Sequence, residues 1–177
     1  EVVAHPDPLS ALENADTRLA ANKHLIHDMW RTVLNAGHQE EAEHFIAENY
    51  IQHSPFQRSG RASMMQMFSV IKRRDEVPPV MRPVPVSFIA DGDLVALVAI
   101  DSLPEPGEKD KKYTTTHFNL FRVIDGKAGE HWHPDRSPPC PELPDAANGG
   151  PAPVIGVSGD EQLKLLQAPS PALAANK

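Results

Sequence analysis

The sequence predicts an α+β domain in which helices come first and an antiparallel sheet follows. Between residues 18 and 73, apolar side chains recur at helical spacing, whereas from residue 84 onward they alternate with polar ones. The turns Asp91-Gly92-Asp93 and Asp125-Gly126 interrupt the alternating part and are typical of β-hairpins. Helices followed by strands, rather than alternating with them, favour the α+β class.

Three helices are expected in the first half of the chain. The first lies between Arg18 and Gly37, which is a natural helix stop. Its apolar residues recur at helical spacing: Ile26, Met29, Trp30, Val33 and Leu34. The second covers residues 39–48 and the third residues 61–73, each with apolar side chains on one side. Between them, Tyr50-Ile51-Gln52-His53 predicts a brief extended segment that Ser54-Pro55 ends.

Four strands are expected in the second half, as two hairpins. The first pairs residues 84–90 with 94–103, and the second pairs residues 113–124 with 127–135. Residues 104–112 are polar and predict a loop between the hairpins.

The composition divides the chain into three parts. Residues 1–17 are expected to be an N-terminal arm, residues 18–137 the folded domain, and residues 138–177 a tail. The tail holds eight of the chain's 18 prolines and only one short helical candidate, so we expect it to wrap the domain, to lie on a partner, or to be partly disordered.

Bulk properties exclude several classes of protein. A net charge of −7 lacks the clustered lysines and arginines of a nucleic-acid-binding surface. No apolar run approaches the roughly 18–20 residues of a membrane span. A single cysteine, Cys140, excludes an intrachain disulfide. The sequence leaves the compartment open: the cytoplasm is slightly favoured, and the periplasm fits if a signal peptide was removed.

The segment His131-Trp132-His133-Pro134-Asp135 is the most informative stretch for function. Side chains alternate on a strand, so His131, His133 and Asp135 are expected on one face. The preceding strand carries a second polar row at alternate positions: Thr115, His117 and Asn119. The hairpin therefore predicts that two polar rows converge on one cavity, suited to proton transfer or metal binding.

Two motifs resemble the SnoaL-like polyketide cyclase family of the nuclear transport factor 2-like superfamily. They are Tyr50-Ile51-Gln52-His53-Ser54-Pro55 and the run from Phe121 to Trp132. The resemblance covers residues 20–136 and implies a cone-shaped, strongly curved antiparallel sheet covered by three N-terminal helices around an apolar pocket. It also implies a homodimer packed sheet against sheet, and acid–base chemistry on hydrophobic molecules without a cofactor.

The sequence departs from the family pattern at two positions. The resemblance implies an aspartate acid/base after Glu-His-Trp, where this chain has His133. Asn119 stands where an acidic residue or histidine is common in the family. A rebuilt site is therefore expected, and the specific cyclase reaction does not carry over.

Candidate roles follow for individual residues. His133 is the expected general acid/base, because an imidazole with an ordinary pKa near ~6.5 exchanges protons around neutral pH. The other candidates for catalysis are His117, His53 and Asp135; the last would orient a histidine or is a solvated turn residue. Candidate substrate-binding residues are Asn119, His131, Trp30, Tyr50, Met64, Phe68 and Arg61.

These observations predict a cofactor-independent lyase or isomerase that acts on a small aromatic or polyketide-like substrate. Aldol or retro-aldol chemistry, dehydration and isomerisation all fit. Two alternatives stay open: a non-catalytic ligand-binding protein of the same fold, and a metal-dependent enzyme that uses the histidines as ligands.

Overall fold

A five-stranded sheet and the helices on one of its faces form the part of the chain that the structure describes. The computed structural model describes residues 2–54, 57–105 and 108–134. The strands are β1 (Ile46–Gln52), β2 (Pro85–Asp91), β3 (Leu94–Glu105), β4 (Glu108–Ile124) and β5 (Lys127–Trp132). They lie in the order β1-β5-β4-β3-β2, and all neighbours are antiparallel except β1 and β5. The α+β class is thus confirmed.

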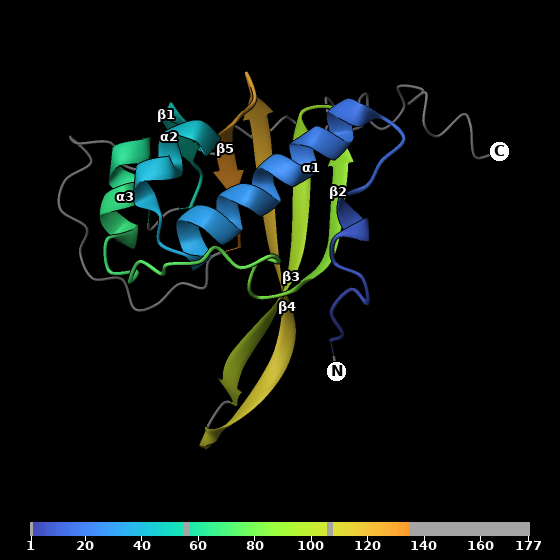
Figure 1. Ribbon diagram of the computed structural model, residues 1–177. Coiled ribbons are helices and arrows are strands. Elements are labelled where there is room, and N and C mark those ends of the chain that lie inside the picture. Colours follow the sequence, from blue (N-terminus) through green and yellow to red (C-terminus); the bar gives the residue numbers. More distant parts are fainter. Residues whose placement is uncertain (1, 55–56, 106–107, 135–177) are drawn as a thin grey trace, which may run out of the picture.

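The helices lie on one face of this sheet (Figure 1). Helix α1 (Thr17–Met29) crosses the sheet, and its N-terminus is capped by the Asp16 carboxylate, which accepts from the backbone of Arg18 and Leu19. It continues as a π-helical turn, η2 (Trp30–Asn35). A 3-10 turn, η3 (Gln39–Glu41), leads into α2 (Ala42–Phe45), and α3 (Arg61–Phe68) follows β1. None of the helices in the described ranges is long and apolar enough to cross a membrane.

The second and third helices are shorter than the helical spacing predicts. A helix over residues 39–48 was wrong beyond Phe45, because Ile46 begins β1 and pairs in parallel with Ala128 of β5. Sheet pairing there overrides the local pattern. The third helix ends at Phe68, and the chain then passes close over Gly37, where a Cβ would meet the Lys72 carbonyl oxygen at 3.1 Å.

The predicted loop at residues 104–112 was also wrong. Strands β3 and β4 continue through it, with Pro104 opposite Lys112 and Glu105 opposite Glu108. The ribbon projects beyond the helices (Figure 1). Backbone pairing needs no apolar side chains, so polar composition alone did not reveal it.

The core lies between the inner sheet face and the helices. The inner face carries Val95, Leu97 and Ala99 of β3, all buried. A short 3-10 turn, η1 (Ser10–Leu12), precedes α1 and places Leu12 in the same core with 0% exposure. The expected C-terminal tail, residues 138–177, lies outside the described residues.

Candidate active site

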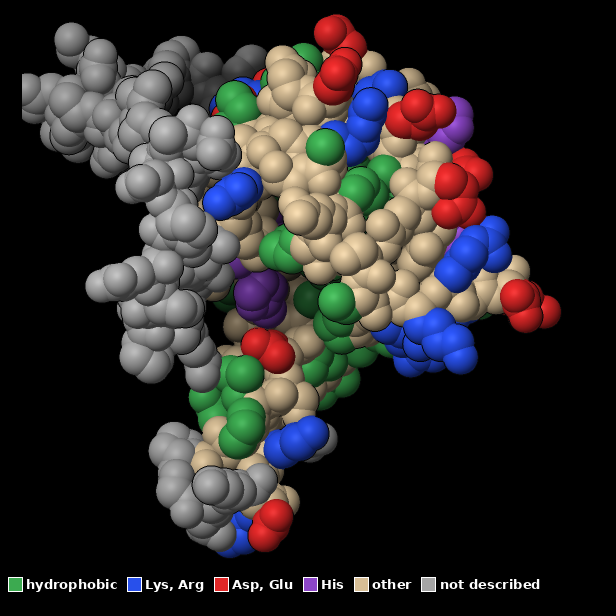
Figure 2. Space-filling model, turned by 90° about the vertical axis from the view of Figure 1, so that its left-hand side faces the viewer, with side chains coloured by type: hydrophobic (Ala, Val, Ile, Leu, Met, Phe, Trp, Pro, Cys, Tyr) green, Lys and Arg blue, Asp and Glu red, His purple; other side chains and the backbone are tan. Residues whose placement is uncertain are grey.

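A cavity of about 320 Å³, which we call the inner cavity, lies between the sheet and the helices. Apolar side chains form most of its wall: Met29, Trp30, Leu34, Met64, Phe68, Ile71 and Phe121. Six polar residues complete it: Gln52, Gln57, His117, Asn119, His131 and His133. Figure 2 shows histidine side chains at the bottom of a hollow on this side of the molecule. The structure therefore brings His117 and Asn119 of one predicted polar row, and His131 and His133 of the other, to one cavity, whereas Thr115 does not line it.

A β-bulge decides which residues of β5 face this cavity. Val123 pairs with Ala128, but Arg122 pairs with Glu130, so Gly129 is an extra residue in β5. Without the bulge, Glu130 would share the inward face of Ala128, and His131 would point outward. The bulge reverses this alternation, and His131 stacks on Phe121 inside, with ring centroids 4.3 Å apart.

A chain of hydrogen bonds fixes the side chains beside the cavity. The Ser54 backbone N–H donates to Gln52 Oε1 at 3.2 Å, so the Gln52 amide nitrogen faces the other way. That nitrogen donates to His131 Nδ1 at 3.1 Å. Since Nδ1 accepts, the proton of the neutral ring is on Nε2, which donates to Asn119 Oδ1 at 3.0 Å.

His131 is held neutral by its surroundings. Burial lowers its pKa to about 3, and the nearby histidines His133, His117 and His53 add to the shift. The Gln52 amide donor on Nδ1 also disfavours a proton there. His131 therefore stays uncharged around neutral pH and holds the Asn119 amide in one orientation.

The Asn119 amide nitrogen is left with an unused donor. Asn119 is 3% exposed, and its Nδ2 has no hydrogen-bond partner among the described residues. Its oxygen already accepts from His131. A buried donor without a partner is costly, and this residue lines the inner cavity. The arrangement suits an oxygen atom of a bound molecule.

His117 and His133 complete the polar side of the cavity. Their ring centroids lie 5.8 Å apart, and the His133 centroid lies 5.0 Å from that of His131. His117 is opposite Ala99 on the inner face of β4, and His133 directly follows β5. Both are partly buried, and the two imidazoles border the same inner cavity.

His53 lies elsewhere. Its Nε2 is 2.8 Å from the Glu130 carboxylate, and its ring stacks on Trp132 with centroids 4.2 Å apart. Glu130 also pairs with Arg122 at 3.1 Å. These partners face away from the inner cavity because of the bulge, and His53 is not among the residues that line it.

The other residues predicted for the site lie in different parts of the structure. Trp30, Met64 and Phe68 line the inner cavity. Tyr50 lines a neighbouring cavity instead. Arg61 donates to the Ile46 carbonyl at 3.0 Å and so supports the start of β1. Asp135 lies outside the described residues.

Sequence reasoning missed Gln52 and Gln57. Gln52 is two residues after Tyr50, on the same face of β1, and that spacing could have marked it. Gln57 follows Pro55 in a segment without periodicity, and no pattern pointed to it. The sequence did not predict the π-helical turn that begins at Trp30. Such turns are frequent at functional sites. This one places Trp30 and Leu34 in the lining of the inner cavity.

The histidines are poorly placed as metal ligands. No group of three His, Cys, Asp or Glu side chains in the described ranges could hold a metal ion. His131 explains why, since one nitrogen donates and the other accepts within the chain of amides. A metal would have to displace one of these bonds.

Comparisons with known proteins agree with the motifs. The family model described as SnoaL-like domain matches residues 26–131, whereas a search of curated proteins finds no significant match. A putative polyketide cyclase from Acidithiobacillus ferrooxidans is 16% identical, with 68% of this chain and 89% of that chain covered and a TM-score of 0.48. A putative SnoaL-like polyketide cyclase from Jannaschia sp. CCS1 is 17% identical, with 64% and 83% covered and a TM-score of 0.47.

Structural likeness at this level carries no argument about activity. The match to the family model, in contrast, spans more than half of the chain. The order of helices and strands also agrees with the fold that the motifs imply. The chain belongs to the SnoaL-like domain family.

Proposed function

We propose that this protein is a cofactor-independent enzyme that forms an enolate from a small aromatic or polyketide-like carbonyl compound. One observation carries the proposal: the unused Asn119 amide donor lies in an apolar cavity that two histidines share. A fixed donor in such a site stabilises negative charge that develops on an oxygen. An imidazole nearby supplies the base.

The proposed reaction begins with proton transfer. The substrate carbonyl oxygen accepts from Asn119 Nδ2, and a nitrogen of His133 removes a proton from the adjacent carbon. The electron pair of that C–H bond moves onto the oxygen, so that Asn119 then stabilises an enolate. His131 does not exchange protons in this scheme; as a neutral donor to Asn119 Oδ1, it is a positioning residue.

The fate of the enolate decides the reaction. Return of the proton to another carbon gives isomerisation, and loss of a β-hydroxyl group gives dehydration. Attack of the enolate on a second carbonyl gives an aldol product, and the reverse order gives retro-aldol cleavage. His117 faces His133 across the same space, and we assign it the second proton transfer. The enzyme is accordingly a lyase or an isomerase.

Deuterium exchange into 2-tetralone tests this proposal without knowledge of the natural substrate. This aromatic ketone has acidic protons beside its carbonyl, and NMR in D2O follows their loss. Wild-type protein should accelerate the exchange. His133→Ala should lower the rate by about 10²-fold or more because it removes the base, whereas His44→Ala, on exposed α2, should not change it.

Asn119→Asp is the sharper variant in this assay. Aspartate keeps an oxygen that can accept from His131 but replaces the donor nitrogen by a second acceptor. The exchange rate should fall by about 10²–10³-fold. Exchange no faster than without protein, while 2-tetralone still binds, would support the alternative of a non-catalytic binding protein.

We also propose a homodimer that forms through the outer face of the sheet. Ile89, Phe118, Leu120 and Trp132 lie on this face, opposite to the cavity. Phe118 is 53% exposed. Two such faces can pack together as sheets do in sandwiches.

A further inference from the structure

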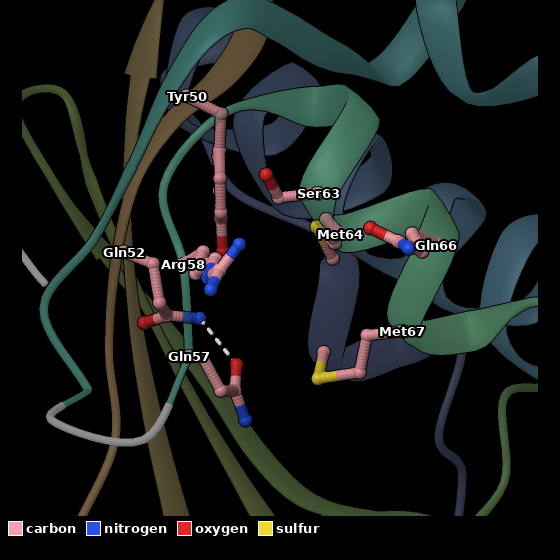
Figure 3. A pocket seen from close by; sticks show the side chains of 8 residues that line it. All are labelled: Tyr50, Gln52, Gln57, Arg58, Ser63, Met64, Gln66 and Met67. Atoms are coloured by element: carbon pink, nitrogen blue, oxygen red, sulfur yellow. Dashed lines mark hydrogen bonds between the residues drawn. The ribbon is translucent and has the colours of Figure 1, made fainter. Parts of the chain in front are cut away.

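A second cavity of about 320 Å³ lies beside the inner one, and we call it the outer cavity (Figure 3). Gln52, Gln57 and Met64 belong to the linings of both. Gln52 Nε2 donates to Gln57 Oε1 at 2.7 Å, and this pair of side chains lies, with Met64, at the place where the two cavities meet. A molecule that extends past these side chains would reach both cavities.

The outer cavity differs from the inner one in its chemistry. Its polar lining includes the Arg58 guanidinium, the Tyr50 and Ser63 hydroxyls and the Gln66 amide. None of the described residues that line it is acidic, although the whole chain carries a net charge of −7. Among the described residues Arg58 forms no ion pair that would neutralise it.

Tyr50 gives an independent sign of a missing partner. The residue is 1% exposed, yet its hydroxyl has no hydrogen-bond partner among the described residues. Figure 3 shows this hydroxyl pointing from β1 toward Gln52, Gln57 and Arg58. Burial raises the pKa of Tyr50 above its ordinary value, so the group stays an O–H donor at physiological pH. Buried tyrosine hydroxyls usually find a partner.

We infer that the outer cavity binds the carboxylate group of the substrate. This inference rests on the proposed function, because the apolar, carbonyl-bearing part of the same molecule would occupy the inner cavity. A carboxylate accepts several hydrogen bonds at once, and Arg58, the Tyr50 hydroxyl and the Ser63 hydroxyl are all donors. An arginine matches the planar shape of a carboxylate. The substrate class is therefore an aromatic or polyketide-like keto acid.

Two probes with one ring system, of which one carries a carboxylate and the other a neutral alcohol, test this inference. 2-Naphthoate and 2-naphthalenemethanol have the same ring system, and calorimetric titration near neutral pH gives their dissociation constants. Wild-type protein should bind the carboxylate at least about tenfold more tightly. Arg58→Gln and Tyr50→Phe should each reduce that preference by about tenfold, whereas Arg18→Gln, at the exposed start of α1, should preserve it.

The melting temperature separates recognition from a structural role. Tyr50→Phe removes a hydroxyl that has no partner in the described protein, so it should not lower the melting temperature. Equal affinity of wild type for both probes, or an unchanged preference in Tyr50→Phe, would overturn the carboxylate site and leave the proposed function standing. Failure of wild type to bind either probe would also overturn the carboxylate site, whereas the exchange of 2-tetralone decides the proposed function separately. Naphthoate binding without exchange of 2-tetralone would contradict the proposed catalysis alone.

Discussion

His131 and His133 are two positions apart in the sequence, yet their surroundings give them different properties. Both nitrogens of His131 are engaged by amide side chains, and the ring is buried against Phe121. His133 follows the end of β5 and is only partly buried. Environment therefore separates a histidine that positions an amide from one that we propose to exchange protons.

The low pKa of His131 predicts a stability that depends on pH. Between about 3, the folded value, and about 6.5, the unfolded value, the unfolded chain binds more protons. The free energy of unfolding should therefore fall as the pH drops below about 6.5, by up to about 1.4 kcal/mol per pH unit. Urea denaturation at about pH 7.5 and about pH 5 measures this loss.

His131→Asn is the control, because burial also lowers the pKa of His27 and acts in the same direction. Between about pH 7.5 and about pH 5 the variant should still lose the unfolding free energy that protonation of His27 costs, but not the part that protonation of His131 costs. An equal loss in both proteins would show that His131 is not held neutral in the fold.

Gln52→Glu should reverse the direction of one hydrogen bond. The carboxylate still accepts from the Ser54 backbone but cannot donate to His131 Nδ1. A proton on Nδ1 then becomes favourable, and the pKa of His131 should rise by more than about one unit. An NMR titration of the ring follows it. Gln57→Glu keeps the acceptor for Gln52 and should raise the pKa less; the same shift in both variants would contradict this mechanism.

At the residue scale, strand alternation predicted more than residue type did. It placed His117 and Asn119 on one face of their strand, and His131 and His133 on one face of the next strand. The structure gathers all four side chains at the inner cavity. The same alternation puts Gln52 on the face of Tyr50, but the role of its amide depends on His131 across the sheet, which the sequence does not reveal. His53 is a candidate because it follows Tyr50 in the segment that the family resemblance brings to the mouth of the barrel, but Glu130 and Trp132 hold its ring outside the inner cavity.

Strand β5 shows how an element can depend on one glycine. A Cβ on Gly129 would meet Ile124 Cδ1 at 2.6 Å and Cγ1 at 2.9 Å. Gly129→Ala should therefore cost about 1–3 kcal/mol of unfolding free energy, as overpacking does. Trimming the partner should relieve the clash: in an Ile124→Ala background the same substitution should cost less than half as much. Urea denaturation of the wild type, the two single variants and the double variant measures these costs. If the costs of the two substitutions simply added in the double variant, the contact would be contradicted.

Part of the N-terminal segment packs against the domain. Lys23 Nζ donates to the carbonyls of Ala11 and Glu13 at 2.9 and 2.6 Å, and Leu12 is fully buried. Leu12→Ala should cost about 2–5 kcal/mol in urea denaturation. Leu9→Ala, in the same segment but exposed, should change stability by less than about 0.5 kcal/mol. Equal costs would mean that Leu12 does not belong to the core.

At the scale of elements, the sequence predicted the hairpin turns and the first helix well because glycines and periodicity mark them. It failed where strand pairing between residues far apart in the sequence decides the local structure. The first residues of β1, 46–48, read as the end of a helix until Ile46 pairs with Ala128 in β5, whereas the extended segment from Tyr50 was expected. The outer half of the β3–β4 ribbon is polar on both sides and has no apolar pattern to detect.

At the scale of the whole molecule, the two faces of the sheet are unequal. Helices cover the inner face (Figure 1), whereas in the described ranges no helix covers the outer one. Ile89 and Phe118 are exposed there, and such apolar faces on soluble proteins commonly mark interfaces. The homodimer that we propose would bury them.

Light scattering coupled to gel filtration tests this dimer. Wild-type protein should elute at twice the 19.4 kDa of one chain. Phe118→Glu should elute at the mass of one chain, because it places a charge without a partner in the middle of the interface. Val70→Glu, exposed after α3 and away from the sheet, should keep the doubled mass. A wild-type protein with the mass of one chain at micromolar concentration would contradict the homodimer, and a Phe118→Glu variant of doubled mass would place its interface elsewhere.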